Sequence, residues 1–221
     1  MITLTATEEN YLKYIYQLGE AQSGLVKTND LAYKLEHSAA SVTDMLKKLA
    51  DKKLLTYTKY YGVSLTKTGL HIAKKVLRKH RLWETFLAKN LKFTWDKIHD
   101  IAEQLEHIQS DELTDKMDEY LGFPKFDPHG DPIPDKQGNI SIPNVICLAD
   151  AKLKKQYILQ NVNDDSAIFL KYLNKIKLQL NDKIKIIDKE EFDETMEMLI
   201  NDKMRITISN DAAKNMYVKS I

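Results

Sequence analysis

The chain has 221 residues, of which 43% are hydrophobic and 29% are charged. This length is sufficient for one or two domains with a real core, so the composition excludes an intrinsically disordered protein. No apolar run approaches the ~18 residues that a membrane-spanning helix needs. The first residues form neither a basic nor an apolar segment, and Cys147 is the single cysteine. We therefore expect a cytoplasmic protein with no membrane segment and no internal disulfide.

The formal net charge of +1 hides an uneven distribution of charge. Residues 1–75 carry 11 Lys and Arg against 7 Asp and Glu, whereas residues 76–121 carry 7 against 10. A basic first third is suited to a polyanion, and an acidic middle is suited to a cation. Because the basic excess is modest, it permits nucleic-acid binding without demonstrating it.

The first predicted element is a helix near the N-terminus. Thr5 and Glu8 have the spacing of a capping box, in which each side chain accepts a hydrogen bond from the other residue's backbone N–H. An apolar stripe at helical spacing follows and ends near Gly19 or Gly24.

Two shorter helices and a hairpin come next. Thr28 can cap a helix over residues 29–35, and Ser38 can cap another whose apolar residues again fall at helical spacing. Two runs of strand-forming residues follow, Leu55–Tyr60 and Val63–Leu65, separated by a short turn. Helix, turn, helix and hairpin in this order predict a winged helix-turn-helix over residues 1–75.

The middle of the chain is predicted to contain three packed helices. Apolar spacing supports one long helix over residues 67–90, a second over 94–109, and a third that opens at Ser110 and closes at Gly122. We expect the large apolar surface of these helices to form a dimer interface. This helical domain would occupy residues 76–143.

A proline-rich loop separates the helices from a C-terminal domain. All five prolines fall within twenty residues, at Pro124, Pro128, Pro132, Pro134 and Pro143. Proline disfavours helix at the preceding residue, so we place a domain boundary here. Beyond it, residues 183–187 and 204–208 are predicted strands and 166–174 a helix. We expect a small, mostly β domain over residues 144–221.

Four side chains with metal-binding groups are concentrated in the second predicted helix of the middle domain. They are His99, Glu103, Glu106 and His107. At about 100° per residue they project at about 0°, 40°, −20° and 80°, within one face. In the preceding helix, His80 and Glu84 are four residues apart. Carboxylates and imidazoles are the usual ligands of divalent first-row metals, so adjacent helices can hold two such ions.

The alternative is that these residues form an ordinary solvated helical face. That interpretation stays open for both groups and is stronger for His80 and Glu84 taken alone than for the four clustered residues. Cys147 and the other histidines, such as His129, are interpreted as structural. The sequence contains no phosphate-binding glycine loop and no nucleophile motif of the known hydrolases.

The helix that Ser38 opens has the composition of a DNA-reading helix. Small and hydroxylic residues occupy its start, which lets a helix approach the floor of the major groove, and Lys47 and Lys48 follow where they can hold the phosphate backbone. A capped helix with a solvated face is the alternative.

Three segments add a resemblance to a known family: His80–Glu84, Glu103–His107 and Pro128–Pro134. Together with the winged helix, they make the chain resemble the diphtheria toxin repressor family of metal-dependent transcriptional repressors over nearly its whole length. The resemblance implies a mainly α protein with a small β component. Its parts would be a winged helix-turn-helix, a helical dimerisation and metal-binding domain, and an SH3-like domain similar to ferrous-transport-A proteins.

The resemblance also implies site residues. A primary metal site would comprise Asn10, Glu103, Glu106 and His107. A second would comprise His80, Glu84 and His99 with an acidic residue of the C-terminal domain, for which Asp165 is the best match and Asp164 the next. The family's DNA contacts would fall on Ser38, Ala40, Ser41, Thr43 and Asp44.

We therefore expect a homodimeric repressor that binds a palindromic double-stranded DNA operator when Mn²⁺ or Fe²⁺ is present and that controls metal-transport genes. The oxygen-rich primary site favours Mn²⁺ over softer ions. We do not expect an enzyme. A metal-dependent hydrolase using the Glu and His cluster is the alternative of another class, and a metal-independent DNA-binding scaffold is a third.

Overall fold

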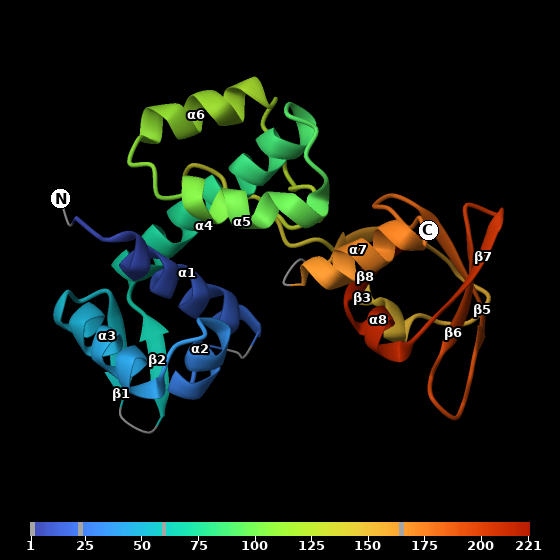
Figure 1. The fold of residues 1–221 in the computed structure, drawn as a ribbon, viewed down its shortest axis with the longest axis horizontal. Helices are drawn as coiled ribbons and strands as arrows, with labels where there is room; N and C mark the ends of the chain where they lie inside the picture. The colour runs from blue at the N-terminus through green and yellow to red at the C-terminus, as the bar shows by residue number, and fades with distance from the viewer. Residues whose placement is uncertain (1–2, 22–23, 59–60, 164–165) are drawn as a thin grey trace. The chain divides into compact units, whose positions relative to one another are not determined.

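The computed structural model describes residues 3–21, 24–58, 61–163 and 166–221, and the chain forms two compact units (Figure 1). The first unit comprises the residues up to His80, together with Glu103–Asp115 and Pro134–Asn139. The second comprises Arg81–Ala102, Lys116–Ile133 and Ile140–Ile221. The backbone thus passes between the units within three helices and twice in the proline-rich loop, and each unit is described by itself.

The first unit contains the expected winged helix-turn-helix. Its elements are α1 (Ala6–Ala21), α2 (Thr28–Lys34), α3 (Ala39–Asp51), β1 (Leu55–Thr58) and β2 (Gly62–Leu65). The two strands pair antiparallel, with Leu55 opposite Leu65. Each helix and the hairpin contribute at least one fully buried apolar residue, among them Leu12, Leu31, Leu46 and Val63. This shared core fixes α3 against the other elements.

The predicted helix starts are largely confirmed. Thr5 N donates to Glu8 Oε2 at 3.0 Å while Glu8 N donates to Thr5 Oγ1 at 3.3 Å, which is a complete capping box. Ser38 Oγ caps α3 by accepting from the backbone N–H of Ser41. Thr28 is not a cap: it is the first residue of α2, because Lys27 adopts the extended capping conformation and its carbonyl accepts the first helical bonds.

Three helices follow the hairpin, α4 (Lys67–Lys89), α5 (Trp95–Leu105) and α6 (Asp111–Tyr120). The prediction that the middle one runs to residue 109 is wrong, because α5 ends at Leu105. There Ile108 N donates to Leu105 O, a tight turn, and the Gln109 amide donates to the His107 carbonyl. Glu106 and His107 therefore project from a turn after the helix.

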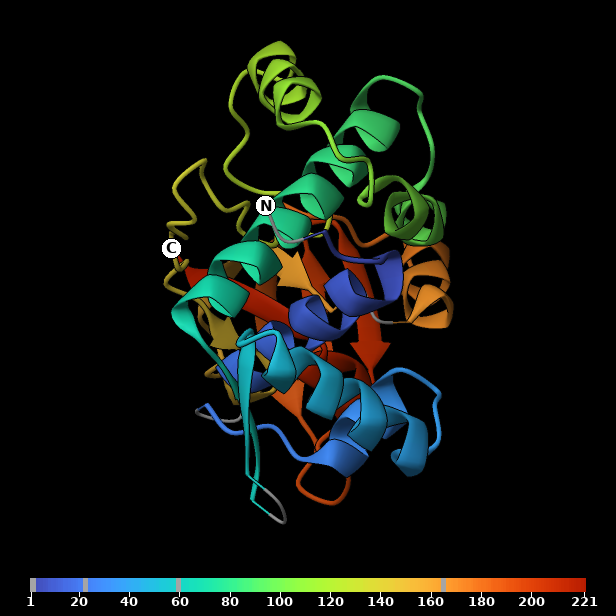
Figure 2. The same ribbon diagram turned by 90° about the vertical axis from the view of Figure 1, so that its left-hand side faces the viewer.

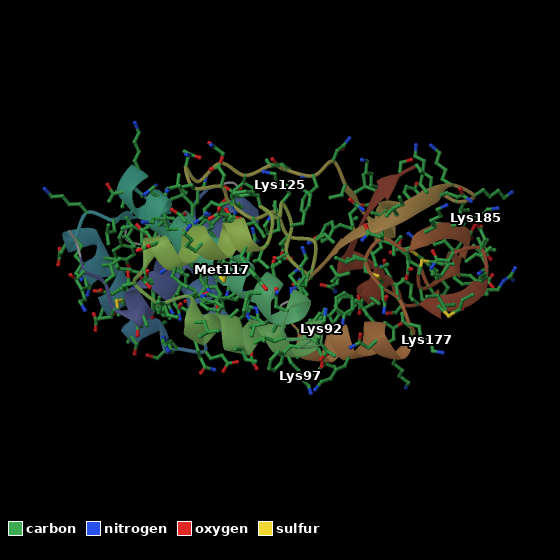
Figure 3. The ribbon with its side chains drawn as sticks, turned by 90° about the horizontal axis from the view of Figure 1, so that it is seen from above. Lys92, Lys97, Met117, Lys125, Lys177 and Lys185 are labelled. Carbon is green, nitrogen blue, oxygen red and sulfur yellow. The ribbon has the colours of Figure 1, made fainter. Side chains whose placement is uncertain are left out.

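In the second unit, two small apolar clusters hold the helical segments together. Leu82 packs with Met117 and Ile133, and Figure 3 marks Met117 on α6. Leu87 packs with Ile98 and Ala102. Burial of aliphatic side chains of this size stabilises each contact by roughly 1.5–3 kcal/mol per side chain.

The C-terminal part of the second unit is a six-stranded antiparallel sheet in the order β3-β8-β4-β5-β6-β7. Its strands are β3 (Ile146–Cys147), β4 (Gln156–Val162), β5 (Lys183–Lys189), β6 (Met196–Ile200), β7 (Met204–Ile208) and β8 (Met216–Ser220). Two helices, α7 (Ala167–Lys175) and α8 (Asn210–Lys214), and the short turn Leu148–Asp150 complete the domain. Leu170 and Leu173 of α7 join the apolar residues of the sheet in one core. Figure 2 shows the strands from a second direction.

None of the helices in the described part of the chain is both long enough and apolar enough to cross a bilayer.

Candidate metal centres and DNA-binding surface

One cluster of ionised side chains lies in the first unit, between α1 and the end of α5. Lys13 of α1 is 1% exposed, and its Nζ donates to Glu106 Oε1 at 2.7 Å and to Glu106 Oε2 at 3.0 Å. The same ammonium donates to Glu103 Oε1, which also accepts from the Tyr14 hydroxyl at 3.1 Å. Two carboxylates are thus held around one cation that belongs to the chain.

His107 is oriented by a carboxylate that the sequence analysis did not select. Its Nδ1 lies 2.7 Å from Glu9 Oε2, and Glu9 Oε1 accepts from the Gln109 amide at 2.8 Å. A carboxylate at one ring nitrogen favours the lone pair on the other, as in many metal-binding histidines. His107 Nε2 lies 3.7 Å from Glu106 Oε1, so both atoms are near enough to contact one ion.

His80 completes this cluster. We name Asn10, His80, Glu103, Glu106 and His107 the first site, in which Asn10 is included as the ligand that the family resemblance implies. His80 Nδ1 lies 2.6 Å from Glu106 Oε2, so the structure brings His80 to the residues of the primary site. Asn10 Oδ1 is buried and accepts no hydrogen bond from any described residue. Buried polar atoms are nearly always paired, so this unpaired oxygen fits the role of metal ligand that the resemblance implies for Asn10.

A second cluster lies within the second unit and combines Glu84 of α4 with Asp127 and His129 of the proline-rich loop. One ligand atom from each lies within 4.8 Å of the others, and all three side chains are buried. His129 Nδ1 is 3.8 Å from Glu84 Oε1, and His99 Nδ1 is 3.5 Å from the same oxygen. We name Glu84, His99, Asp127 and His129 the second site.

The geometry of His129 explains why this cluster can bind a cation. Its Nε2 is 3.0 Å from the carbonyl oxygen of Trp95, which can only accept, so Nε2 carries the proton and Nδ1 presents its lone pair. Asp127 Oδ1 meanwhile accepts from the backbone N–H groups of His129 and Asp131 at 2.8 and 2.9 Å. These bonds hold the loop in a tight turn.

Asp127 and His129 are candidate ligands that sequence reasoning missed. They are about 45 residues from Glu84 in the chain, in a loop whose conformation no periodicity reports, and His129 was interpreted as structural. The sequence feature that could have indicated them is the run Asp127-Pro128-His129-Gly130, in which two potential ligands lie in a proline and glycine turn. Asp165, the expected fourth ligand of the second site, and Asp164 lie outside the described residues.

The predicted DNA-reading residues lie at the exposed start of α3. Ser38, Ala40, Ser41 and Asp44 are exposed, whereas Val42, Leu46 and Leu49 on the opposite face are fully buried. Thr43 is half-buried, and its hydroxyl donates to the Ala39 carbonyl at 2.8 Å.

The two lysines of this surface have acidic partners within the unit. Lys47 Nζ lies 3.3 Å from Asp44 Oδ1 on the exposed face, and Lys48 Nζ lies 3.1 Å from the buried Glu8 carboxylate. Exposed ion pairs of this type contribute little to stability, so Lys47 can exchange its partner for a phosphate at small cost.

Three consecutive segments of the chain each match a known domain family. Residues 3–63 match the family described as iron dependent repressor, N-terminal DNA binding domain. Residues 66–135 match iron dependent repressor, metal binding and dimerisation domain, and residues 146–220 match the FeoA domain, an SH3-like fold. The two repressor matches together cover more than half of the chain.

Individual relatives agree with this assignment. The chain is 33% identical over 134 residues to the diphtheria toxin repressor of Corynebacterium jeikeium, a match that covers 61% of this chain and 55% of that protein. It is 34% identical over 119 residues to the transcriptional regulator MntR of Bacillus pumilus, covering 54% of this chain and 81% of that one. The chain thus spans about half the length of the first relative.

Among solved structures, one described as a manganese-dependent transcriptional repressor in complex with manganese has a TM-score of 0.88 and 32% identity, with 97% of this chain and 100% of that chain covered. The structure of the manganese regulator SloR has a TM-score of 0.79 and the same identity, covering 97% and 98%. The order of domains, their folds and these similarities lead to one conclusion: the chain belongs to the diphtheria toxin repressor family of metal-dependent transcriptional repressors.

Proposed function

We propose that this protein represses transcription by binding double-stranded DNA when its first site holds Mn²⁺ or Fe²⁺. The observation that carries the proposal is the contact between α1, a helix of the winged helix-turn-helix, and the residues after α5: Lys13 Nζ donates to Glu106 Oε1 at 2.7 Å, and Glu9 Oε2 lies 2.7 Å from His107 Nδ1. The relatives named above are transcriptional regulators. The matching family models are described as iron dependent and one of the solved structures as manganese-dependent.

The side chains of the first site fit such an ion. Asn10, Glu103, Glu106 and His107 would hold it, and the carboxylates and amide form the hard donor set that suits Mn²⁺ and Fe²⁺. When bound, the ion supplies positive charge that draws these donors together. Glu9 keeps His107 Nε2 turned toward Glu106, and Tyr14 keeps Glu103 in place.

These residues can couple metal to DNA because they come from two functional segments. A ligand shifts a conformational equilibrium only by binding one state better than another. Asn10 belongs to α1, whose Glu8 pairs with Lys48 and Lys52 of α3, whereas Glu106 and His107 follow α5. Coordination of one ion by ligands from both segments would therefore favour one position of α1, and with it one position of the DNA-reading helix α3.

The second site is part of the same proposal. Glu84, Asp127 and His129 offer two carboxylates and one imidazole, and His99 lies near enough to Glu84 to add a second imidazole. Because the ligands bridge α4 and the proline-rich loop, an ion here would fasten that loop to the helix. Asp165 stays a predicted ligand from the C-terminal domain.

We further propose that two copies of the chain pair through the helices of residues 76–143 and read a palindromic operator with their α3 helices. The exposed small residues at the start of α3 support major-groove entry, and a two-fold dimer reads two symmetric half-sites. The domain limits of residues 1–75, 76–143 and 144–221, a cytoplasmic location and control of metal-transport genes are parts of this proposal.

Selection of DNA from a random-sequence library tests the function. The full chain is incubated anaerobically with Mn²⁺, with Fe²⁺ or with a chelator, and the retained duplexes are sequenced. We expect an inverted repeat to be enriched with either metal and not with the chelator. Equal enrichment with the chelator would contradict metal dependence, and the absence of a repeat would contradict dimeric recognition.

A further inference from the structure

Two adjacent residues in the first turn of α1 contact two different parts of the first unit. Glu9 Oε2 lies 2.7 Å from Nδ1 of His107, a residue of the first site. Glu8 makes its ion pairs with lysines of α3 instead. Figures 1 and 2 show α1 and α3 as neighbours within the winged helix-turn-helix. The first turn of α1 therefore links the first site to α3.

The contacts of Glu8 are short and the side chain is fully buried. Its Oε1 lies 2.7 Å from Lys52 Nζ and 3.1 Å from Lys48 Nζ, while its Oε2 accepts from Thr5 N at 3.0 Å. Charge-assisted hydrogen bonds of this length are stronger and more directional than neutral ones. Every described contact of the carboxylate therefore restrains its position.

Both lysines lie at the same end of α3. Lys52 is the C-cap residue, and Lys48 lies in the last turn. The other end of the helix, from Ser38 to Ser41, is exposed and carries the predicted DNA contacts. A restraint on the C-terminal end of a rigid helix sets the direction in which its N-terminal end points.

We propose that Glu8 is a positioning residue that transmits metal occupancy of the first site to α3 through Lys52 and Lys48. The inference rests on the proposed function and adds to it the residue that carries the coupling. Because Glu8 and Glu9 are adjacent in one helical turn, a change in the position of Glu9 that follows His107 would move the Glu8 carboxylate. The two lysines follow it, and α3 is placed accordingly.

The test measures DNA affinity with and without Mn²⁺ for full-length variants. The probe is a duplex selected by the unmodified protein, and the readout is the ratio of the two Kd values. Glu8→Gln removes the charge but keeps an acceptor for Thr5 N. Glu20→Gln, an exposed carboxylate of the same helix, is the matched control. Calorimetry with Mn²⁺ alone reports metal affinity, and thermal unfolding reports stability.

We expect Glu8→Gln to lower the Kd ratio by at least ~5-fold, the lower end of ordinary allosteric coupling, with Mn²⁺ affinity in the absence of DNA unchanged. Glu20→Gln should keep the original ratio. In a double-mutant cycle, Glu8→Gln combined with Lys52→Met should lower the ratio no further than either single change.

A purely structural role predicts a different result, which would overturn the inference. Both DNA affinities would then fall by the same factor as stability decreases, and the ratio would stay at its original value. Additive effects of Glu8→Gln and Lys52→Met would also contradict it. A ratio near one in the unmodified protein would instead refute the proposed function, and the inference with it.

Discussion

Lys13 is the residue that most alters the chemistry of the first site. Its ammonium is almost completely buried and contacts both oxygens of Glu106 as well as Glu103. A fixed cation between two carboxylates stabilises the metal-free fold, and it also competes with any ion for the same oxygens. Lys13 is therefore expected to stabilise the metal-free state and to weaken metal binding.

The first prediction is that Lys13→Met destabilises the metal-free protein by about 3 kcal/mol, because it leaves the buried Glu106 carboxylate beside Glu103 without a cation. The same change should increase the stabilisation that Mn²⁺ provides, since the competing charge is gone. Thermal unfolding with and without Mn²⁺ measures both effects. Lys34→Met is the control, because Lys34 also lies over the Tyr14 ring. Equal or smaller stabilisation by Mn²⁺ in Lys13→Met would contradict this account.

The second prediction concerns acid stability and Glu8. Burial raises the pKa of this carboxyl, but hydrogen bonds from Lys52, Thr5 N–H and Lys48 outweigh burial and lower the pKa from 4.5 to about 2. Since the native pKa is below the unfolded one, the contribution to stability is complete above about pH 4.5 and is lost as pH falls toward 2.

Glu8→Gln should therefore be less stable than the metal-free unmodified protein at pH 6, and the difference should shrink as the pH is lowered toward 3. Urea unfolding at several pH values measures this difference in free energy. A difference that is constant across this range would show that the Glu8 charge does not contribute in this way.

At the residue scale, sequence reasoning succeeded where spacing in the chain reports proximity. Glu103, Glu106 and His107 are neighbours in sequence and lie together in the first site. Glu9 and Asp127 could not be found this way, because their roles depend on contacts across about 100 and about 45 residues. Their spatial neighbours are set by tertiary packing.

At the scale of elements, α3 presents one fully buried face and one exposed start. The third prediction is that Ser41→Leu with Thr43→Leu abolishes DNA binding, because two bulky side chains would prevent the helix from approaching the base edges. Mn²⁺ affinity and the oligomeric state should not change, since neither residue lies in the first site. Calorimetry and sedimentation check these two properties, and fluorescence anisotropy checks DNA binding. Unaltered anisotropy titrations would remove α3 from the DNA interface.

The fourth prediction concerns the loop that carries His129. Gly130 has φ +92°, and a Cβ there would lie 1.9 Å from the Gln160 carbonyl oxygen of β4. Gly130→Ala should cost about 2 kcal/mol or more and displace His129 from Glu84. Gly122→Ala is the matched control. Gly122 has φ +77° with open space around it, so this change introduces the backbone strain without a steric clash.

Calorimetry then separates the loss of stability in Gly130→Ala from the displacement of His129. Its Mn²⁺ stoichiometry should fall relative to Gly122→Ala if the second site binds an ion. Equal stoichiometry in the two variants would refute the assignment of the second site.

Sequence patterns predicted most helices but fewer strands. Side-chain caps at Thr5 and Ser38 and apolar stripes act locally, and the predicted positions of α1, α2 and α3 are confirmed to within a few residues. The end of α5 was misplaced, because Gln109 and the residues after Leu105 satisfy the backbone through a turn. Strand β6 was not predicted: its Met residues have little intrinsic strand preference, and its alternating burial depends on pairing with β5 and β7.

At the scale of the whole molecule, the order of domains could be predicted because each has its own sequence signature. The winged helix is marked by caps and a hairpin, the middle domain by its long helices, and the boundary by clustered prolines. The backbone nevertheless passes between two compact units within α4, α5 and α6, which no compositional change reveals. Such a division depends on packing, which the sequence does not display locally.

The central claim is that an ion at the first site controls DNA binding, and fluorescence anisotropy of a selected duplex with the full chain tests it most directly. The titration is performed anaerobically at matched free Mn²⁺, at matched free Fe²⁺ and with a chelator. We expect metal to raise DNA affinity by at least ~5-fold, and Glu106→Ala and His107→Ala each to lose this response while circular dichroism shows them folded. Equal affinity with chelator, or a normal metal response in both variants, would contradict the account.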